Sequence, residues 1–367
     1  MGSLLKDIYS LSFYNKLSKI LIEVIPGFKK VEFIKTIFTP DFETKELKDR
    51  MRHTAKVLHD FFPPDYSETI KLIKTLISKC REKGMEDGGL EYFFLPDYIE
   101  TYGLDDYETS VKALEYITQF VSCEFGVRPF LVKYGDKMMK QMLAWSKHKN
   151  YKVRRLASEG SRPRLPWAMA VPALKKDPKP ILPILENLKN DPSESVRRSV
   201  ANNLNDIAKD HPEIVLLTAQ KWTGISKETD AVIKHGSRTL LKQGHVEILK
   251  HYGLDAKNIR LGNFKIINPE IKIGHSLEFV FEITNMSVRE QKVRLEYAIF
   301  YRKQNGQASK KVFKISEKIY QPKAKETIQR KQKFILITTR KFYIGAHKLS
   351  IIINGVEKAI GIFVLIG

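Results

Sequence analysis

Two glutamates, Glu124 and Glu159, are the side chains of this sequence best suited to acid–base chemistry. Glu124 lies in Cys-Glu-Phe-Gly-Val-Arg-Pro-Phe (residues 123–130), and Glu159 in Ser-Glu-Gly-Ser-Arg-Pro-Arg-Leu-Pro-Trp-Ala (residues 158–168). A carboxylate can stabilise a developing cation and can orient or deprotonate a water molecule. Taken alone, each glutamate is more readily explained as a solvated or salt-bridged surface group. Its obvious partners would then be two nearby arginines, Arg128 and Arg162.

The second segment predicts a rigid loop after a helix. Gly160 is expected to be the C-cap of that helix, and Pro163 and Pro166 prevent the helix from resuming. The loop carries two guanidinium groups and an indole ring, those of Arg162, Arg164 and Trp167. The arginines either cap helix ends or contact phosphate groups. The indole ring either packs against the next helix or is presented to a bound cationic group.

The elements that must position these residues are repeated helices. Val153, Leu156 and Ala157 form one apolar stripe at helical spacing, and the neighbouring arginines point away from it. The triplet Val-Arg-Arg that starts at Val153 returns at Val196 and, as Ile-Lys-His, at Ile233, at intervals of 43 and 37 residues. These intervals match the two-helix period of HEAT-type repeats.

Equivalent positions of stacked repeats lie side by side, so the basic residues are expected to form one positive track that fits a duplex backbone. The members of this track are Arg154, Arg155, Arg197, Arg198, Lys234 and Arg238. The alternative is that these arginines form structural pairs with acidic residues of a neighbouring repeat. The separation of Glu124 and Glu159 is also close to one repeat, which would place both on the concave face.

The chain is expected to have two domains: a HEAT-like solenoid over residues 1–255 and an immunoglobulin-like β-sandwich over residues 260–367. Helical periodicity continues to about Leu254, and period-two patterns follow. The strands expected in the tail include residues 277–283, 294–301 and 333–337, and Asn-Gly pairs at Asn305 and Asn354 predict hairpins. About seven short strands without a Cys-Trp-Cys core fit a disulfide-free immunoglobulin-like sandwich.

The charge balance points to a polyanionic partner. The 367 residues include 63 Lys and Arg but 42 Asp and Glu, a net charge of +21. Residues 260–367 hold 21 of these basic residues and 8 of the acidic ones, so this tail is expected either to grip DNA or to be a solvated surface. The two cysteines and the scattered histidines predict neither a disulfide framework nor a metal site. No apolar run predicts a membrane span, so a cytoplasmic protein is expected.

The two segments that carry the glutamates closely resemble the AlkC branch of the AlkC/AlkD DNA-alkylation-repair glycosylases. The resemblance covers roughly residues 1–255. It extends to nearly the whole chain, because some AlkC-like proteins carry an immunoglobulin-like domain after the repeats. It implies a monomeric, monofunctional DNA glycosylase that needs no cofactor and acts in base excision repair, associated with the nucleoid. Its substrates would be N3-methylated bases in duplex DNA, chiefly 3-methyladenine, with 3-methylcytosine as a second candidate.

The resemblance also implies roles for individual residues. Glu124 is expected to be the principal catalytic carboxylate and Glu159 a supporting or binding one, although the sequence leaves open which dominates. Trp167 and Arg162 are expected at the lesion, which an open concave surface would reach through its sugar and backbone. The residues expected to contact the DNA backbone are Arg128, Arg154, Arg155, Arg164, Arg197, Arg198, Lys234 and Arg238. The rival functions are a non-catalytic DNA-binding scaffold and a HEAT-repeat adaptor for an acidic protein.

Overall fold

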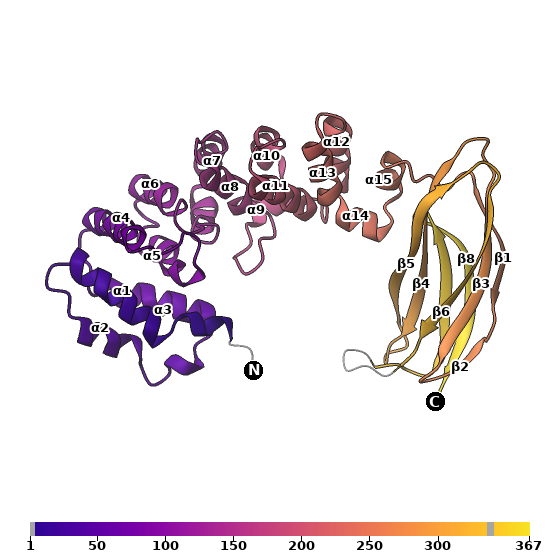
Figure 1. The fold of residues 1–367 in the computed structure, drawn as a ribbon, viewed down its shortest axis with the longest axis horizontal. Helices are drawn as coiled ribbons and strands as arrows, with labels where there is room; N and C mark the ends of the chain where they lie inside the picture. Colours follow the sequence, from indigo (N-terminus) through magenta and orange to yellow (C-terminus); the bar gives the residue numbers. More distant parts are fainter. Residues whose placement is uncertain (1–3, 336–340) are drawn as a thin grey trace. The chain divides into compact units, whose positions relative to one another are not determined.

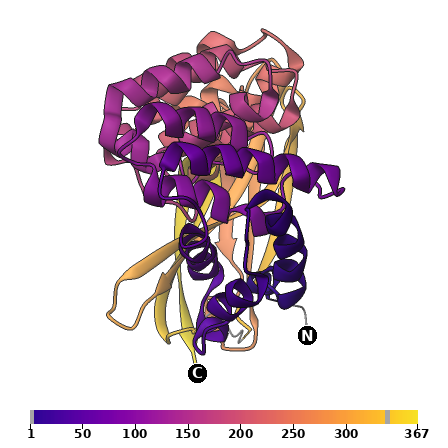
Figure 2. The same ribbon diagram turned by 90° about the vertical axis from the view of Figure 1, so that its left-hand side faces the viewer.

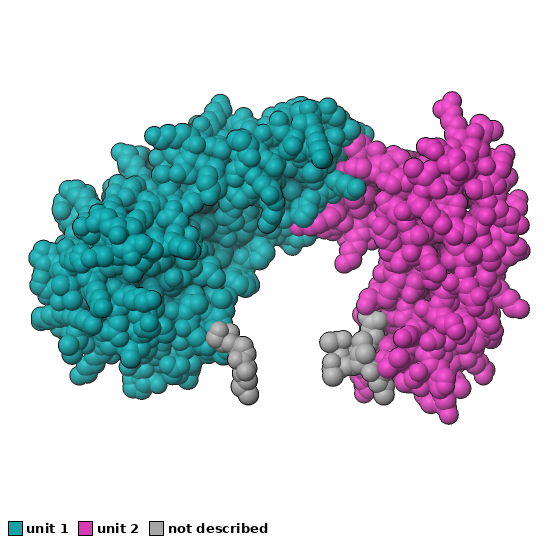
Figure 3. All heavy atoms as spheres, in the orientation of Figure 1, with its two compact units in different colours: residues 1–236 teal, residues 237–367 magenta. Residues whose placement is uncertain are grey.

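The computed structural model describes residues 4–335 and 341–367. The chain divides into two compact units, Met1–Gly236 and Ser237–Gly367, which Figure 3 colours separately. Helices come first and strands second, as Figure 1 shows, which confirms the predicted order of a helical-repeat solenoid followed by a β-sandwich. Within the described residues, every helix is too short or too polar to cross a membrane.

The first unit consists of stacked helices. They are α1 (Leu11–Val24), α2 (Lys30–Ile37), α3 (Leu47–His59), α4 (Tyr66–Glu82), α5 (Phe94–Tyr102), α6 (Tyr107–Ile117), α7 (Arg128–Trp145), α8 (Tyr151–Gly160), α9 (Pro172–Lys176), α10 (Leu182–Leu188), α11 (Glu194–Ile207), α12 (Pro212–Trp222) and α13 (Lys227–Gly236). The stack can be followed from indigo through magenta into the pink tones that precede orange in Figures 1 and 2.

Five of these helices form what we call the inner row: α3, α5, α8, α11 and α13. Within this row α3 packs on α5, and α11 packs on both α8 and α13. In Figure 1 the row lines the concave side of the helical unit. Val153, Val196 and Ile233, the positions that defined the repeat in the sequence, are all buried in this packing. The predicted repeat therefore corresponds to one inner helix per period.

Gly160 is the last residue of α8 rather than its C-cap, which is Ser161. The expectation of a glycine cap was therefore wrong, and the need for glycine has another cause. A Cβ atom at this position would lie 2.6 Å from Val127 Cγ1 and 3.0 Å from Met142 Cε. Glycine is required because α8 ends in close contact with the start of α7.

The second unit is a sandwich of two sheets, ordered β1-β3-β6 and β2-β8-β7-β4-β5. Its strands are β1 (Ile259–Ile266), β2 (Glu270–Lys272), β3 (Ser276–Asn285), β4 (Gln291–Arg302), β5 (Ala308–Tyr320), β6 (Lys325–Lys333), β7 (Gly345–Ile353) and β8 (Val356–Ile366). Neighbouring strands are antiparallel except β2 and β8. Aromatic and aliphatic side chains from both sheets share one core.

The strands expected at residues 277–283 and 294–301 are confirmed as β3 and β4. The one expected at residues 333–337 was misplaced, since β6 ends at Lys333, and residues 336 and 337 lie outside the described ranges. The sequence Lys-Glu-Thr-Ile-Gln-Arg-Lys-Gln-Lys of β6 hid this strand, because most of its side chains are exposed. Both predicted hairpins are confirmed, between β4 and β5 and between β7 and β8.

Two short helices, α14 (Arg238–Gln243) and α15 (Val246–His251), belong to the same compact unit as the sheets. They pack on the turn between β7 and β8. The backbones of Gly244 and Gly355 are in such close contact that a Cβ on Gly244 would lie 3.2 Å from the Gly355 Cα atom. The Asn354 side chain donates a hydrogen bond to the Asp255 carbonyl at 2.8 Å. Helical sequence thus extends to His251, whereas the unit that contains the sheets begins at Ser237.

His347 is a buried titratable group in the sandwich core, with 2% of its surface exposed. Its Nδ1 atom lies 2.9 Å from the Gly345 carbonyl oxygen and donates to it, and Nε2 has no partner within the described residues. Burial lowers the pKa of His347 below the ordinary 6.5; the Gly345 carbonyl opposes this shift and Arg302 adds to it.

The unfolded chain binds a proton that folded His347 resists. Protonation of this residue should therefore not weaken the second unit above pH 6.5, but should destabilise it as the pH falls below that value. His347→Phe, which suits the aromatic surroundings, should remove this dependence between about pH 5 and 7. Urea unfolding of the wild-type protein and of the His347→Phe variant across that pH range checks the prediction. An identical pH dependence in the two chains would contradict it.

Candidate functional site

Glu124 lies in the turn that precedes α7, and two side chains orient it. Ser122 Oγ and Arg155 Nη1 each donate to Glu124 Oε2 at 2.7 Å. Oε1 has no hydrogen-bond partner within the described residues, and 15% of the side chain is exposed. Arg155 and Glu159 are one turn apart on the same face of α8. Glu124 therefore contacts the face of α8 that also carries Glu159.

Glu159 is more deeply buried, with 6% of its side chain exposed, and belongs to a cluster centred on Arg162. The guanidinium group donates from Nη1 to Glu159 Oε1 and from Nε to Asp206 Oδ2, the latter at 2.8 Å. Burial alone would lower the pKa of Arg162, but the two carboxylates outweigh it and raise the pKa above its ordinary value. Lys209 donates to the other Asp206 oxygen at 3.0 Å.

The pairing of Arg162 with a predicted carboxylate is confirmed, and Asp206 is the member of the cluster that sequence reasoning missed. Its position in α11, 44 residues beyond Arg162, gave no local signal. The available clue was a single acidic residue beside the buried Ile207 in a helix that stacks on α8. No group of His, Cys, Asp and Glu side chains suited to a metal ion occurs in residues 4–335 and 341–367.

Trp167 stands out from the loop that follows α8. It is 64% exposed, so the alternative that its ring packs against the next helix does not hold. Its φ angle is +64°, a left-handed conformation that non-glycine residues rarely adopt. The Lys48 ammonium group of α3 donates to the Trp167 carbonyl oxygen at 2.5 Å. A large ring is thus held in solvent on a strained backbone.

Arg128, expected at the DNA backbone, is fully buried. It donates from Nη1 to the carbonyl oxygens of Gly160 and Arg162, both at 2.8 Å, and from Nε to the Met169 carbonyl oxygen at 2.5 Å. It does not pair with Glu124. A phosphate group has no access to this guanidinium. The expected contact of Arg128 with the DNA backbone was therefore wrong, and its contacts are inside the protein.

The first arginine of each repeated pair caps the loop before its own helix. Arg154 Nη1 donates to the carbonyl oxygens of His148 and Lys149, and Arg197 Nη1 donates to the equivalent pair, those of Asp191 and Pro192. Arg154 also forms a two-pronged ion pair with the next repeat, at 2.6 and 3.0 Å from the Asp191 carboxylate. For Arg154 the structure supports the alternative of pairing with an acidic residue of the next repeat, whereas the printed partners of Arg197 are backbone carbonyls of its own loop.

The remaining basic residues of the predicted track are placed differently. Arg198 is exposed, and its one ion pair among the described residues is with Glu194, one turn before it on α11. Lys234 is exposed on α13 and makes no ion pair within the described residues. Arg164 forms a partly exposed ion pair with Asp210. Arg238 opens α14 and belongs to the second compact unit rather than to the inner row.

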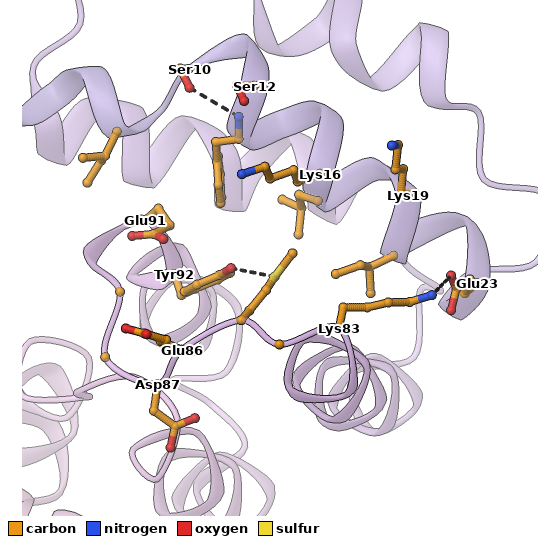
Figure 4. A pocket seen from close by; sticks show the side chains of 18 residues that line it. Ser10, Ser12, Lys16, Lys19, Glu23, Lys83, Glu86, Asp87, Glu91 and Tyr92 are labelled. Atoms are coloured by element: carbon orange, nitrogen blue, oxygen red, sulfur yellow. Dashed lines mark hydrogen bonds and ion pairs between the residues drawn. The ribbon is translucent and has the colours of Figure 1, made fainter.

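The helical unit contains two cavities of note, of which one adjoins this site. One of about 300 Å³ adjoins it, between α3, α5 and the residues Phe125, Ala168 and Met169. Another of about 950 Å³ lies between α1 and residues 83–92, contains none of the predicted site residues and is seen in Figure 4. There, lysines of α1 and acidic side chains of residues 86–91 line opposite walls. Asp87 of that acidic wall accepts a hydrogen bond from Lys152 at the start of α8.

Comparisons with known proteins cover the whole chain. The family model described as the C-terminal Ig-like domain of the uncharacterised protein YhaZ matches residues 260–367, and a HEAT-repeat model matches residues 181–211. The curated protein YhaZ of Bacillus subtilis strain 168, named as uncharacterised, is 46% identical over 355 residues, which are 96% of this chain and 97% of YhaZ.

A solved structure is similar over the full length of both chains. It is the alkylpurine DNA glycosylase AlkC of Pseudomonas fluorescens, bound to DNA that contains an abasic site analog. The TM-score is 0.84, the sequence identity is 34%, and the match covers 100% of each chain.

Replacing Arg162 by Leu should destabilise the helical unit by about 3–5 kcal/mol, because it leaves the buried carboxylates of Glu159 and Asp206 without their shared cation. The matched control is Arg198→Leu, which removes only an exposed pair with Glu194 and should cost within about 1 kcal/mol. The free energy of unfolding in urea measures both. Equal losses in the two variants would show that the Arg162 cluster does not hold α8 to α11.

Proposed function

This chain belongs to the AlkC family of DNA-alkylation-repair glycosylases, and we propose that it removes cationic N3-methylated bases from duplex DNA. The substrates are chiefly 3-methyladenine, with 3-methylcytosine as a second one. The observation that carries the proposal is the full-length similarity to an alkylpurine DNA glycosylase whose structure contains DNA. Two further observations support it: Glu124 contacts Arg155 of α8, the helix that carries Glu159, and Trp167 is exposed in the loop that follows this helix.

The reaction is hydrolysis of the bond between base and deoxyribose. Methylation at N3 places a positive charge on the base and weakens this bond. When the bond breaks, both electrons leave with the base and the sugar gains oxocarbenium character. A water molecule then attacks C1′ and loses a proton, which leaves an abasic site. The enzyme contributes by stabilising the cation and by orienting the water, and it needs no cofactor for either.

Glu124 is the carboxylate we assign to the reacting sugar. Ser122 and Arg155 occupy Oε2 and fix the orientation of the carboxylate, while Oε1 remains for a water molecule or for the developing charge at C1′. Glu159 has a supporting role, because it is less accessible and shares Arg162 with Asp206.

Trp167 and Arg162 are the residues we assign to the lesion nucleotide. An exposed indole face can attract a cationic base or sugar by cation–π interaction. Arg162 uses Nε and Nη1 on its carboxylates, so Nη2 is the atom we assign to lesion contact. The accessible cations Arg198 and Lys234 would contact phosphates, as would Arg164 on exchanging Asp210 for DNA. The basic second unit would add further phosphate contacts.

The protein would then act as a monomer in the cytoplasm, associated with the nucleoid, within base excision repair. Its binding to DNA should weaken steeply with salt, because displaced counterions supply much of the affinity of phosphate contacts. A chain that binds DNA in this way but never releases a base would be a DNA-binding scaffold instead. A chain whose binding to an acidic protein is unaffected by duplex DNA would be an adaptor.

Glu124→Gln should lower single-turnover release of 3-methyladenine from alkylated duplex DNA by roughly 100-fold, because it removes the charge but keeps the shape. Glu159→Gln should cause a smaller loss. Both variants should keep the affinity of the wild-type chain for DNA with an abasic-site analog. Chromatography of the released base and fluorescence anisotropy measure the two quantities. Release by the wild-type chain no faster than spontaneous loss would refute the glycosylase assignment.

Trp167→Ala should leave the free energy of unfolding within about 0.5 kcal/mol of the wild-type value, because the ring is exposed and alanine meets the same strain at positive φ. Base release should nevertheless fall about 10-fold or more if the ring contacts the lesion nucleotide. Urea unfolding and the same release assay check both parts. A variant with full activity would remove Trp167 from the site.

A further inference from the structure

The loop that carries Trp167 has few hydrogen bonds of its own. Between the end of α8 and the start of α9, its internal backbone bonds include a long one from the Ala168 N–H group to the Leu165 carbonyl oxygen, at 3.4 Å. The Trp167 backbone conformation is unfavourable for a residue with a side chain. A conformation of this kind persists only where the surroundings hold it.

Arg128 is hydrogen-bonded to this loop on both sides of Trp167. One planar guanidinium group joins the carbonyl oxygens of Gly160 and Arg162, before the tryptophan, to that of Met169, after it. The fixed fork of an arginine suits this arrangement, whereas the single ammonium group of a lysine cannot reproduce it. The residues on the two sides of Trp167 are thus tied to one rigid point at the start of α7.

The burial of Arg128 is costly and has no direct carboxylate partner to offset it. Burial, with the neighbouring Arg162 cation, lowers the pKa of Arg128 to about 10, so the group is still charged at neutral pH. Carbonyl dipoles are its direct partners, and the carboxylates of Glu159 and Asp206 assist from further away. Arg128 is a buried cation bonded to the loop that carries Trp167, and a cation buried at such a cost calls for a role beyond filling space.

We propose that Arg128 is a positioning residue for base excision: it fixes the loop of residues 160–169 so that Trp167 is presented to the lesion nucleotide. This inference rests on the glycosylase function proposed above. Arg128 touches neither DNA nor the reacting atoms and acts only through the loop. Its loss should therefore slow the chemical step much more than it weakens DNA binding.

The chain offers a matched control in Arg50. This arginine is also buried and also donates to backbone carbonyl oxygens, those of Lys45 at 3.1 Å and Lys6 at 3.3 Å. Unlike Arg128, it forms an ion pair as well, with Glu43 at 3.2 Å. It lies in α3 and has no contact with the Trp167 loop. Arg50→Lys and Arg128→Lys therefore disturb similar backbone clamps, but only Arg128→Lys should affect excision.

The experiment compares both lysine variants in three measurements. Arg128→Lys should slow single-turnover release of 3-methyladenine about 10- to 100-fold, since small misplacements of a positioned group cost rate on this scale. Its affinity for abasic-analog DNA should change no more than about threefold, and trypsin should cleave after Arg164 faster than in the wild type. Arg50→Lys should match the wild type in rate and in cleavage. An equal loss of rate in both variants would overturn the proposal.

A double-mutant cycle with Trp167→Ala tests the route of the effect. If Arg128 acts through the tryptophan, Arg128→Lys should add little to the loss already caused by Trp167→Ala. The same fold-loss in both backgrounds would overturn the proposal. Pro166→Gly supplies a second variant, should Arg128→Lys not fold. It loosens the exposed loop with Arg128 intact and should slow release, so wild-type release by Pro166→Gly would also overturn the proposal.

Failure of this inference is distinguishable from failure of the proposed function. If the wild-type chain releases no base, the glycosylase proposal and the positioning role fall together. If the wild-type chain releases base and Arg128→Lys does so at the same rate, only the positioning role is refuted. Tryptic cleavage of the loop needs no substrate, so it reports whether Arg128 holds the loop in either case.

Discussion

One buried guanidinium group, that of Arg128, joins the two segments from which the candidate site is built. Its own segment supplies Glu124, four residues earlier, and the carbonyl oxygens it holds flank Trp167. The close contact between Gly160 and Val127 brings the same two segments together through packing. The hydrogen bonds of Arg128 and the packing of Gly160 on Val127 thus fix one junction, between the end of α8 and the start of α7. The positions of the carboxylates and of the indole ring depend on this junction.

Basic residues of the inner row divide into two kinds. Some, such as Arg154 and Arg197, donate to backbone carbonyl oxygens, and Arg154 also pairs with a carboxylate of the next repeat. Others, such as Arg198 and Lys234, stay accessible to solvent. The net charge of the sequence therefore overestimates the number of cations on this row that are accessible to a nucleic acid. The structural arginines set the spacing of the helices, and the accessible cations take their positions from that spacing.

Local sequence patterns predicted the architecture, but they did not predict contacts between side chains and groups that are far apart in the sequence. The apolar stripe through Val153 and the change from helical to alternating periodicity predicted repeats followed by a sandwich. The pair of Glu159 and Arg162 was foreseeable because the two are three residues apart. The contacts of Arg128 were not foreseeable, because its partners are backbone carbonyls, which every residue possesses. Asp206 was missed because its contact depends on how two repeats stack.

The turn at Gly355 meets two demands at once. Its φ angle of +79° suits the tight hairpin between β7 and β8, and any Cβ there would lie 2.2 Å from Leu249 Cδ1 of α15. The short helices α14 and α15 are thus built into the sandwich. In evolutionary terms, the piece of chain that could be exchanged between proteins as one folding module starts near Ser237. A descendant that lost the sandwich would leave these two helices without the surface on which they pack.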